Sequence, residues 1–484
     1  MTTNTEGLDG SPMRRVLTWR DGFRFAINIA IGLFLTLGYT IGAIGTWLTI
    51  GLWLVAGLVA FLQNHLFAEM AALFRNRSGG IPVYAYEGWK SRLAPLGAIA
   101  TFGYWMGWSF SLSVESSALG LLVQQAFFPD FEWHVHIANQ EIGLPHLIAI
   151  ACLAVTWALN YFGVKITRDV VKVIATLYLI GLATLVIGTF SSPTVNFDIA
   201  RLSLQGSPGW RELVVWFYVT AWTIYGTGMC ATFAPEYKDP VRDTSKALKS
   251  SAMFMLALYF IVPLTVAGSL GEKTIGANPI TYIGIAFDQI LGGFGWLGTL
   301  PIIASFLISM MTATADGGRA LYGIAQSGST IRQLGVLNRY GVPGRALTLD
   351  AVLNTFIIVF LGAPISILLA SNLGYILAMT LAIGAFVLLR RDHPEADRPI
   401  RLRQTWIYVA VVLFSFNLFV LVVGIASPGL AGYGGLRDTL TGLGVLLVGV
   451  VLFAYRQKVQ DRGRIRWRVK DEALPTRERT GVNT

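Results

Sequence analysis

The sequence predicts an all-α polytopic membrane protein, and three observations carry this prediction. Of its 484 residues, 54% are hydrophobic and only 13% are charged, whereas soluble proteins carry about 25% charged residues. The mean hydropathy is +0.59. Many apolar runs reach the roughly 20 residues that a helix needs to cross hydrocarbon. These features exclude a secreted disulfide scaffold, a disordered chain and a soluble multidomain enzyme.

Twelve apolar segments are expected to form transmembrane helices, which puts both termini on the same side of the membrane. They lie at about 22–38, 42–66, 95–124, 145–162, 172–190, 212–234, 252–270, 293–324, 347–363, 365–389, 405–426 and 435–456.

Basic residues are distributed unevenly between the connections. Only four of the 37 Lys and Arg lie in odd-numbered connections: Arg201, Arg211, Lys273 and Arg437. Because basic residues resist translocation, we expect a multi-pass protein of the cell membrane with both termini in the cytoplasm. In a protein of the lipid bilayer, this uneven distribution of basic residues explains the formal charge of +10 without a nucleic-acid partner. The polar stretch 1–21 shows no removable signal peptide.

The C-terminal tail is strongly basic, with nine Lys and Arg between Arg456 and Arg479. One interpretation is adhesion to anionic lipid, which is worth about 1 kcal/mol per basic residue near the surface. The other is an ordinary tail that obeys the positive-inside rule.

Two spans contain weak helical stretches near their centres. In the sixth span, Gly226 and Gly228 lie beside β-branched residues such as Thr227, which predicts a break in the helix. These glycines could instead form a close-packing surface. In the first span, Asn28 and Gly32 are the irregular features. Unwound backbone inside a membrane is tolerated only where it lines a cavity.

Spans one and six hold corresponding positions in two halves of five spans, which fits an inverted repeat. The expected organisation is an N-terminal tail (1–21), two five-helix repeats (22–190 and 212–389), helices eleven and twelve (405–456) and a basic cytoplasmic tail (457–484).

Three segments resemble the signature motifs of one transporter family. They are Ala68-Glu69-Met70-Ala71 with Ser78-Gly79-Gly80 and Tyr84-Ala85-Tyr86, then Glu236-Tyr237-Lys238-Asp239-Pro240 with Arg242 and Ala247, and Gly318-Arg319-Ala320-Leu321-Tyr322-Gly323-Ile324-Ala325 with Gly328, Pro343 and Ala346. In this order they resemble the amino acid–polyamine–organocation superfamily, over residues 22 to about 390.

The resemblance implies a leucine-transporter-like fold, with helices one and six broken around a central site, and transport by alternating access. It also implies that N–H groups of helix one bind the substrate carboxylate and that carbonyl groups of helix six bind its amine. The partial charges at helix ends agree with these roles. Transferred by position, the substrate-binding residues are Asn28, Ala30, Ile31, Gly32, Trp222, Gly226 and Gly228.

The chain departs from the family pattern at three positions. Ile31 stands where the family usually has a small or hydroxyl-bearing residue. Gly228 stands where some relatives have a glutamate, and Tyr178 where some have a lysine in place of a sodium ion.

Glu115 lies deep in the third span. An ionised carboxylate at the bilayer centre costs about 2.5–3.5 kcal/mol on insertion scales. Three interpretations stay open: a structural acid bonded to hydroxyls such as Ser111 or Ser116, a proton-coupling site, and a counter-ion for an amine substrate. Burial favours the neutral form of a carboxyl group, which is what coupling requires.

Four aromatic residues lie within spans three and six, which flank the expected site: Trp105, Trp108, Trp222 and Tyr225. They form either an aromatic wall, which could cover an apolar group or attract an ammonium group, or ordinary packing.

Three further acids are expected to be structural. Asp316 lies three residues before Arg319, a spacing that predicts a local ion pair on one helix face. Glu69 and Asp350 lie near span ends, which predicts positions at the membrane interface.

We therefore expect a secondary transporter for an amino acid or a related organic amine, driven by protons or by exchange. The alternatives are a polyamine or choline-like amine carrier and, from another class, a non-transporting sensor or a subunit that requires a partner. The five histidines are scattered, and no enzyme activity, cofactor or metal is expected. The substrate and the oligomeric state stay open.

Overall fold

The computed structural model describes residues 13, 15–27, 30–137, 140–204, 208–360, 364–432, 435–470 and 474. Its long helices are α1 (Trp19–Ile27), α2 (Ala30–Ile44), α3 (Thr46–Leu73), α4 (Ile81–Leu93), α5 (Pro95–Phe127), α6 (Leu144–Tyr161), α7 (Val164–Ser191), α8 (Trp210–Tyr225), α9 (Pro240–Leu270), α10 (Glu272–Ala277), α11 (Tyr282–Leu291), α12 (Trp296–Gln326), α13 (Gly344–Phe360), α14 (Pro364–Asp392), α15 (Trp406–Ala426) and α16 (Leu436–Tyr455). The strands β1 (His134–Ile137) and β2 (Gln140–Gly143) form an antiparallel hairpin.

Within the described residues, ten helical segments are long and apolar enough to cross a membrane. This confirms a multi-pass, all-helical architecture. The other two predicted spans coincide with α5 and α13, which fall short in length or hydropathy. Helix α13 has only 17 residues. Helix α5 is buried along most of its length, from Pro95 to Gly120, so its polar residues face protein rather than lipid.

The backbone changes character at Gly226, while Gly32 lies within an α-helix. Helix α1 ends at Ile27 and α2 begins at Ala30, while Asn28 lies outside the described residues. Helix α8 ends at Tyr225, and a 3-10 helix follows over Gly226–Glu236. The expected break at Gly226 is therefore a change from α to 3-10 helix rather than unwound backbone. A 3-10 run of 11 residues is long, since such runs rarely exceed four residues and often mark hinges when they lie within a longer helix.

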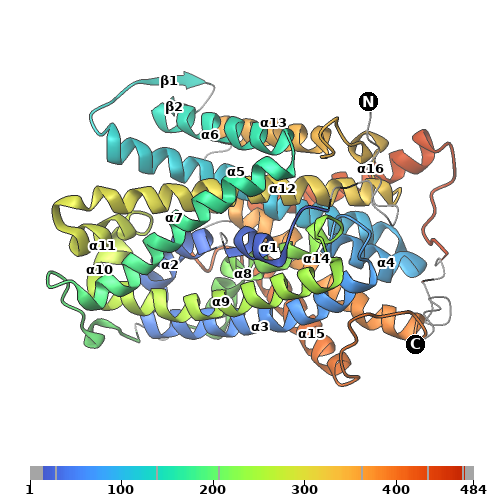
Figure 1. Ribbon diagram of the computed structural model, residues 1–484, viewed down its shortest axis with the longest axis horizontal. Helices are drawn as coiled ribbons and strands as arrows, with labels where there is room; N and C mark the ends of the chain where they lie inside the picture. Colours follow the sequence, from blue (N-terminus) through green and yellow to red (C-terminus); the bar gives the residue numbers. More distant parts are fainter. Residues whose placement is uncertain are drawn as a thin grey trace.

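The helices form two packed groups. Helix α3 packs along α9, and α1, α2 and α8 with its 3-10 extension join them; α5, α6, α12 and α13 pack on one another. Most helices run along the longest axis of the molecule (Figure 1). Helix α4 lies at one end of that axis, and α10 and α11 lie at the other (Figure 1).

Helix α4 was not expected. No span was predicted between residues 66 and 95, yet residues 81–93 of this stretch form a 13-residue helix. Gly80 precedes it at φ 56°, and a proline occupies its first turn, where the missing N–H group costs nothing.

Glu272 joins three segments at the end of the molecule that holds α10. Its carboxylate accepts hydrogen bonds from the backbone N–H and hydroxyl of Thr46, at 2.7 and 2.6 Å, and from the N–H of Ser203 at 2.9 Å. The Ser203 hydroxyl also donates to it. Burial alone would raise the pKa of Glu272, but these hydrogen bonds outweigh it and hold the pKa below its ordinary value.

Replacing Glu272 with glutamine is expected to lower the free energy of unfolding by roughly 1 kcal/mol at neutral pH. Because the folded-state pKa is lowered, the carboxylate's contribution is complete above the ordinary value of about 4.3. It is lost as the pH falls through the folded-state pKa. Melting curves of both proteins across this range should therefore converge in acid. Glu141→Gln, at an exposed glutamate of β2, is the control, and a constant difference between the melting curves would contradict the assignment.

Candidate functional site

Helix α2 and the end of helix α8 meet at Gly32. A Cβ atom on Gly32 would lie 2.2 Å from the Thr223 hydroxyl and 2.6 Å from Cζ3 of Trp222. Real Cβ atoms are not found this close to other atoms. Glycine therefore allows the two helices to approach each other here, a few residues before α8 changes to a 3-10 helix.

Aromatic rings cover this contact from the side of α5 and α14. The rings of Trp108 and Trp222 meet edge to face with centroids 6.3 Å apart. Tyr375 of α14 lies 6.0 Å from the Trp108 ring and 5.5 Å from the Tyr104 ring. The Trp108 ring meets both Trp222 and Tyr375 edge to face, a favoured geometry for aromatic pairs. The four rings form one buried cluster.

Three polar groups at this contact have no hydrogen-bond partner among the described residues. They are the indole N–H groups of Trp108 and Trp222 and the hydroxyl of Thr223. All three side chains are buried. Buried polar groups are normally paired, so unpaired ones require an explanation. An indole N–H can only donate, so the two indoles are donors without an acceptor among the described residues.

Asn372 of α14 holds the end of α8 in place. Its amide oxygen accepts a hydrogen bond from the backbone N–H of Trp222 at 3.1 Å. Its amide nitrogen donates to the backbone carbonyl of Val219 at 2.9 Å. Asn372 was not among the predicted site residues. An asparagine inside an apolar span was the available signal, because a polar side chain in a membrane usually faces the bundle interior.

The other aromatic residues of the predicted wall point elsewhere. The Trp105 indole donates to Asp350 of α13 at 3.1 Å. The Tyr225 hydroxyl donates to Asn417 of α15 at 2.7 Å. Only Trp108 and Trp222 are brought together, so the predicted wall is half as large as expected.

The remaining predicted site residues are divided between the two helix junctions. Ala30 is the first residue of α2, and Gly226 is the first of the 3-10 helix. Ile31 is fully buried and lines a small, mainly apolar cavity between α2, α5, α11 and α12. A Cβ atom on Gly228 would lie 2.7 Å from Ile81 of α4, so this glycine serves close packing.

Glu115 of α5 pairs with a neighbouring helix. Its carboxyl accepts a hydrogen bond from the Ser309 hydroxyl of α12 at 2.8 Å. Its other oxygen has no partner among the described residues. The partners suggested by the sequence are wrong, because Ser111 and Ser116 donate to carbonyl groups of their own helix. Since Glu115 is fully buried and its hydrogen bond among the described residues comes from a neutral hydroxyl, the neutral acid is the favourable form.

Comparison with known proteins identifies the family. The model of the amino acid permease family matches residues 17–452. The chain belongs to the amino acid permease family. Members of this family are transporters, which confirms the prediction that the chain is not an enzyme.

Several curated relatives of the permease are named as transporters or permeases. An uncharacterized transporter of Mycobacterium tuberculosis is 24% identical over 453 residues, covering 90% of this chain and 89% of the relative. The D-serine/D-alanine/glycine transporter of Escherichia coli is 20% identical, covering 84% and 89%. The lysine-specific permease of Saccharomyces cerevisiae is 22% identical, covering 67% of this chain and 54% of the relative.

A buried ion pair joins the two helix groups of the permease. Arg319 of α12 binds the carboxylate of Glu236, the last residue of the 3-10 helix, through Nε and Nη2. Both side chains are 3% exposed, and the guanidinium lies 4.7 Å from the Phe233 ring centre. The predicted local pair between Arg319 and Asp316 is therefore wrong, because the 3-10 helix brings in a glutamate that is distant in sequence.

The other acids predicted to be structural are buried. Asp316 accepts a hydrogen bond from the Tyr104 hydroxyl at 2.7 Å. Glu69 binds Arg390 at 2.6 Å. Glu69 and Asp350 are 2% and 0% exposed, so both are enclosed by protein, and their position at the membrane interface stays a prediction. Hydrogen bonds and ion pairs with distant helices explain how these polar groups are tolerated inside the permease.

Proposed function

We propose that the permease carries an amino acid by alternating access and binds it between the α1–α2 junction and the end of α8. The observation that carries this proposal is the set of three unpaired donors on the end of α8 and the adjoining α5, from Trp222, Thr223 and Trp108. A carboxylate only accepts hydrogen bonds, so it complements such a set.

This donor set supports an amino acid over a decarboxylated amine or polyamine. An ammonium group has three donors and no acceptor, so it would leave the two indole N–H groups unpaired. The runner-up is an amine carrier in which the faces of the same indole rings attract the ammonium group. It is favoured by Ile31, which stands where the family usually has a small or hydroxyl-bearing residue.

The proposed movement separates the two packed helix groups. We place α1, α2, α3, α8 and α9 in the moving bundle, and α5, α6, α12 and α13 in the scaffold. The ion pair between Arg319 and Glu236 would close one side of the site. On the other side, the Tyr282 hydroxyl of α11 donates to the Phe34 carbonyl of α2 at 3.0 Å. The inverted five-helix repeat belongs to the same proposal, as does a cytoplasmic position for both termini, which the distribution of basic residues supports.

We further propose that Glu115 takes up and releases the coupling proton. The substitution Glu115→Gln keeps a hydrogen-bond acceptor for Ser309 but removes the titrating group. It is expected to flatten the pH dependence of uptake and to leave the chain folded, and uptake should be measured across acid and neutral pH. The control is Glu132→Gln, at an exposed glutamate before β1. Unchanged pH dependence with unchanged affinity would reduce Glu115 to a structural role.

Uptake by the isolated permease in liposomes tests the proposal as a whole. Saturable uptake of an amino acid is the expected result. A chain that binds amino acids but never moves them would instead be a sensor or a subunit that requires a partner.

A further inference from the structure

The segment Arg464–Lys470, called the strap here, alternates basic and apolar residues. Its basic residues occupy every second position: Arg464, Arg466, Arg468 and Lys470. Ile465, Trp467 and Val469 lie between them. In an extended chain, successive side chains point to opposite faces. The strap therefore has one apolar face and one basic face.

The apolar face of the strap is docked on the permease. Ile465 and Val469 pack on a cluster formed by Ala94, Ala98 and Phe453. Two backbone hydrogen bonds fix the register, because the Ala94 N–H donates to the Trp467 carbonyl and the Val469 N–H donates to the Lys90 carbonyl, both at 2.8 Å. The strap is thus held along the corner between α4 and α5.

The basic face of the strap points outward. All four of its basic residues are exposed. No ion pair joins them to a carboxylate in the part of the chain that the structure describes. The nearby acid Asp461 pairs instead with Arg332 and Arg456. The docked strap therefore presents four free positive charges in one row.

The strap also lies where the membrane surface is expected. It follows α16, which exposes the apolar side chains Leu447, Val451 and Tyr455 along one side, as a lipid-facing helix does. Trp467 is 58% exposed, and exposed tryptophan and tyrosine are typical of the boundary between lipid and water. Figure 1 shows the end of α16 and α4 at the same end of the molecule.

We propose that the strap is a binding site for the headgroups of anionic phospholipids. Negative headgroups complement a row of exposed basic residues that is fixed at the height of the bilayer surface. The proposal rests on the proposed cytoplasmic position of the C-terminal tail.

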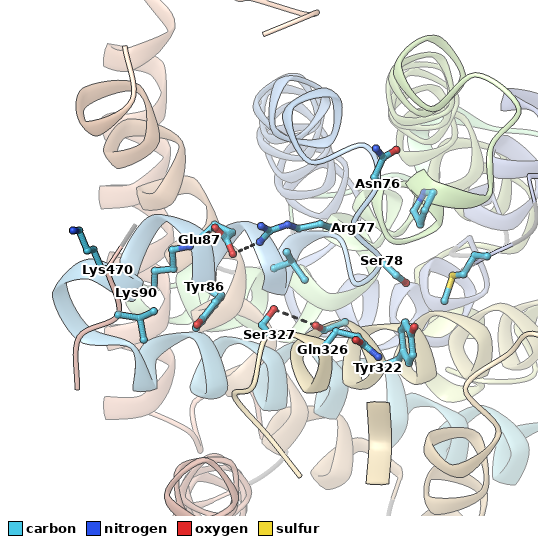
Figure 2. A pocket seen from close by; sticks show the side chains of 15 residues that line it. Asn76, Arg77, Ser78, Tyr86, Glu87, Lys90, Tyr322, Gln326, Ser327 and Lys470 are labelled. Atoms are coloured by element: carbon cyan, nitrogen blue, oxygen red, sulfur yellow. Dashed lines mark hydrogen bonds and ion pairs between the residues drawn. The ribbon is translucent and has the colours of Figure 1, made fainter. Parts of the chain in front are cut away.

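The strap forms part of the wall of a pocket, which we place on the cytoplasmic side. Val469 and Lys470 line a cavity of about 450 Å³ together with residues of α4 and α12. Figure 2 shows Lys470 near Lys90 at one edge of this pocket, with Glu87 and Arg77 next to them. Lipid on the basic face would therefore hold one wall of the pocket in place.

Titration of the detergent-purified, full-length permease with fluorescent phosphatidylglycerol tests the proposal, with phosphatidylcholine as the neutral comparison. The triple variant Arg464→Gln, Arg466→Gln and Arg468→Gln is expected to weaken phosphatidylglycerol binding by about tenfold or more. High salt should weaken binding to the wild type but have little effect on the variant. Equal melting temperatures would show that the variant is folded.

The matched control removes three exposed arginines elsewhere, by Arg339→Gln, Arg345→Gln and Arg401→Gln, and has the same net charge. It is expected to bind phosphatidylglycerol like the wild type. Equal weakening in both triple variants would show a net-charge effect and overturn the site. Wild-type binding by the strap variant would also overturn it. Because the assay measures lipid rather than uptake, its outcome is separate from that of the transport proposal.

Discussion

Replacing Gly32 with alanine is expected to reduce uptake at least about tenfold while the permease still folds. The added Cβ atom would lie 2.2 Å from the Thr223 hydroxyl and 2.6 Å from the Trp222 ring, so α2 and α8 must move apart. Overpacking of this kind typically costs about 1–3 kcal/mol. The shift displaces Trp222 and Thr223, two of the three donors that we assign to the substrate carboxylate, and small misplacements of such groups have large effects. Initial uptake rates in liposomes, at equal protein content, measure the effect.

The control for this substitution is Gly51→Ala on α3. A Cβ atom on Gly51 would meet nothing within 4 Å, so the same chemical change should leave uptake near the wild-type rate. If Gly32→Ala transported as well as Gly51→Ala, the contact between α2 and α8 would have no part in the transport site.

The second large effect is expected at the ion pair between Arg319 and Glu236. The substitution Arg319→Met leaves the Glu236 carboxylate buried without its cation, since both side chains are 3% exposed. Breaking a buried pair in this way typically costs about 3–5 kcal/mol. We therefore expect a strongly lowered melting temperature and little functional protein. Melting curves of the purified variants measure the loss.

The double variant Arg319→Met and Glu236→Gln separates charge burial from general damage. With no unpaired charge left, most of the stability should return, because replacing both members of a buried pair is often neutral. Arg332→Met is the control at an exposed pair, where Arg332 is 61% exposed and an effect of about 0–1 kcal/mol is expected. A double variant as unstable as the single one would contradict the account.

The architecture could be predicted from the sequence because a membrane helix must satisfy its backbone internally and face lipid with apolar side chains. Both requirements are local, so hydropathy locates ten of the spans. The change of backbone at Gly226 was also readable, since glycines beside β-branched residues weaken an α-helix locally. The sequence did not predict that a 3-10 helix follows, because this conformation depends on packing against neighbouring helices.

Partners of buried polar groups could not be predicted, because they come from distant parts of the chain. Arg319 had a plausible local partner in Asp316, yet Glu236 lies 83 residues away in sequence and binds it instead. Trp105 and Trp108 show the same limit. They lie within one turn of α5, but one donates to Asp350 and the other packs on Trp222, a division that depends on where α13 and α8 lie.

We propose that the unpaired donors of Trp108, Trp222 and Thr223 bind the carboxylate of an amino acid. The most direct test is a thermal-shift screen of the purified permease with amino acids, each beside its decarboxylated amine. A ligand at 100 times its dissociation constant adds about 2.7 kcal/mol to the free energy of unfolding. The account predicts stabilisation by an amino acid and not by its amine, and loss of this difference in the double variant Trp108→Phe and Trp222→Phe. Stabilisation by the amine alone would contradict the account and make the permease an amine carrier.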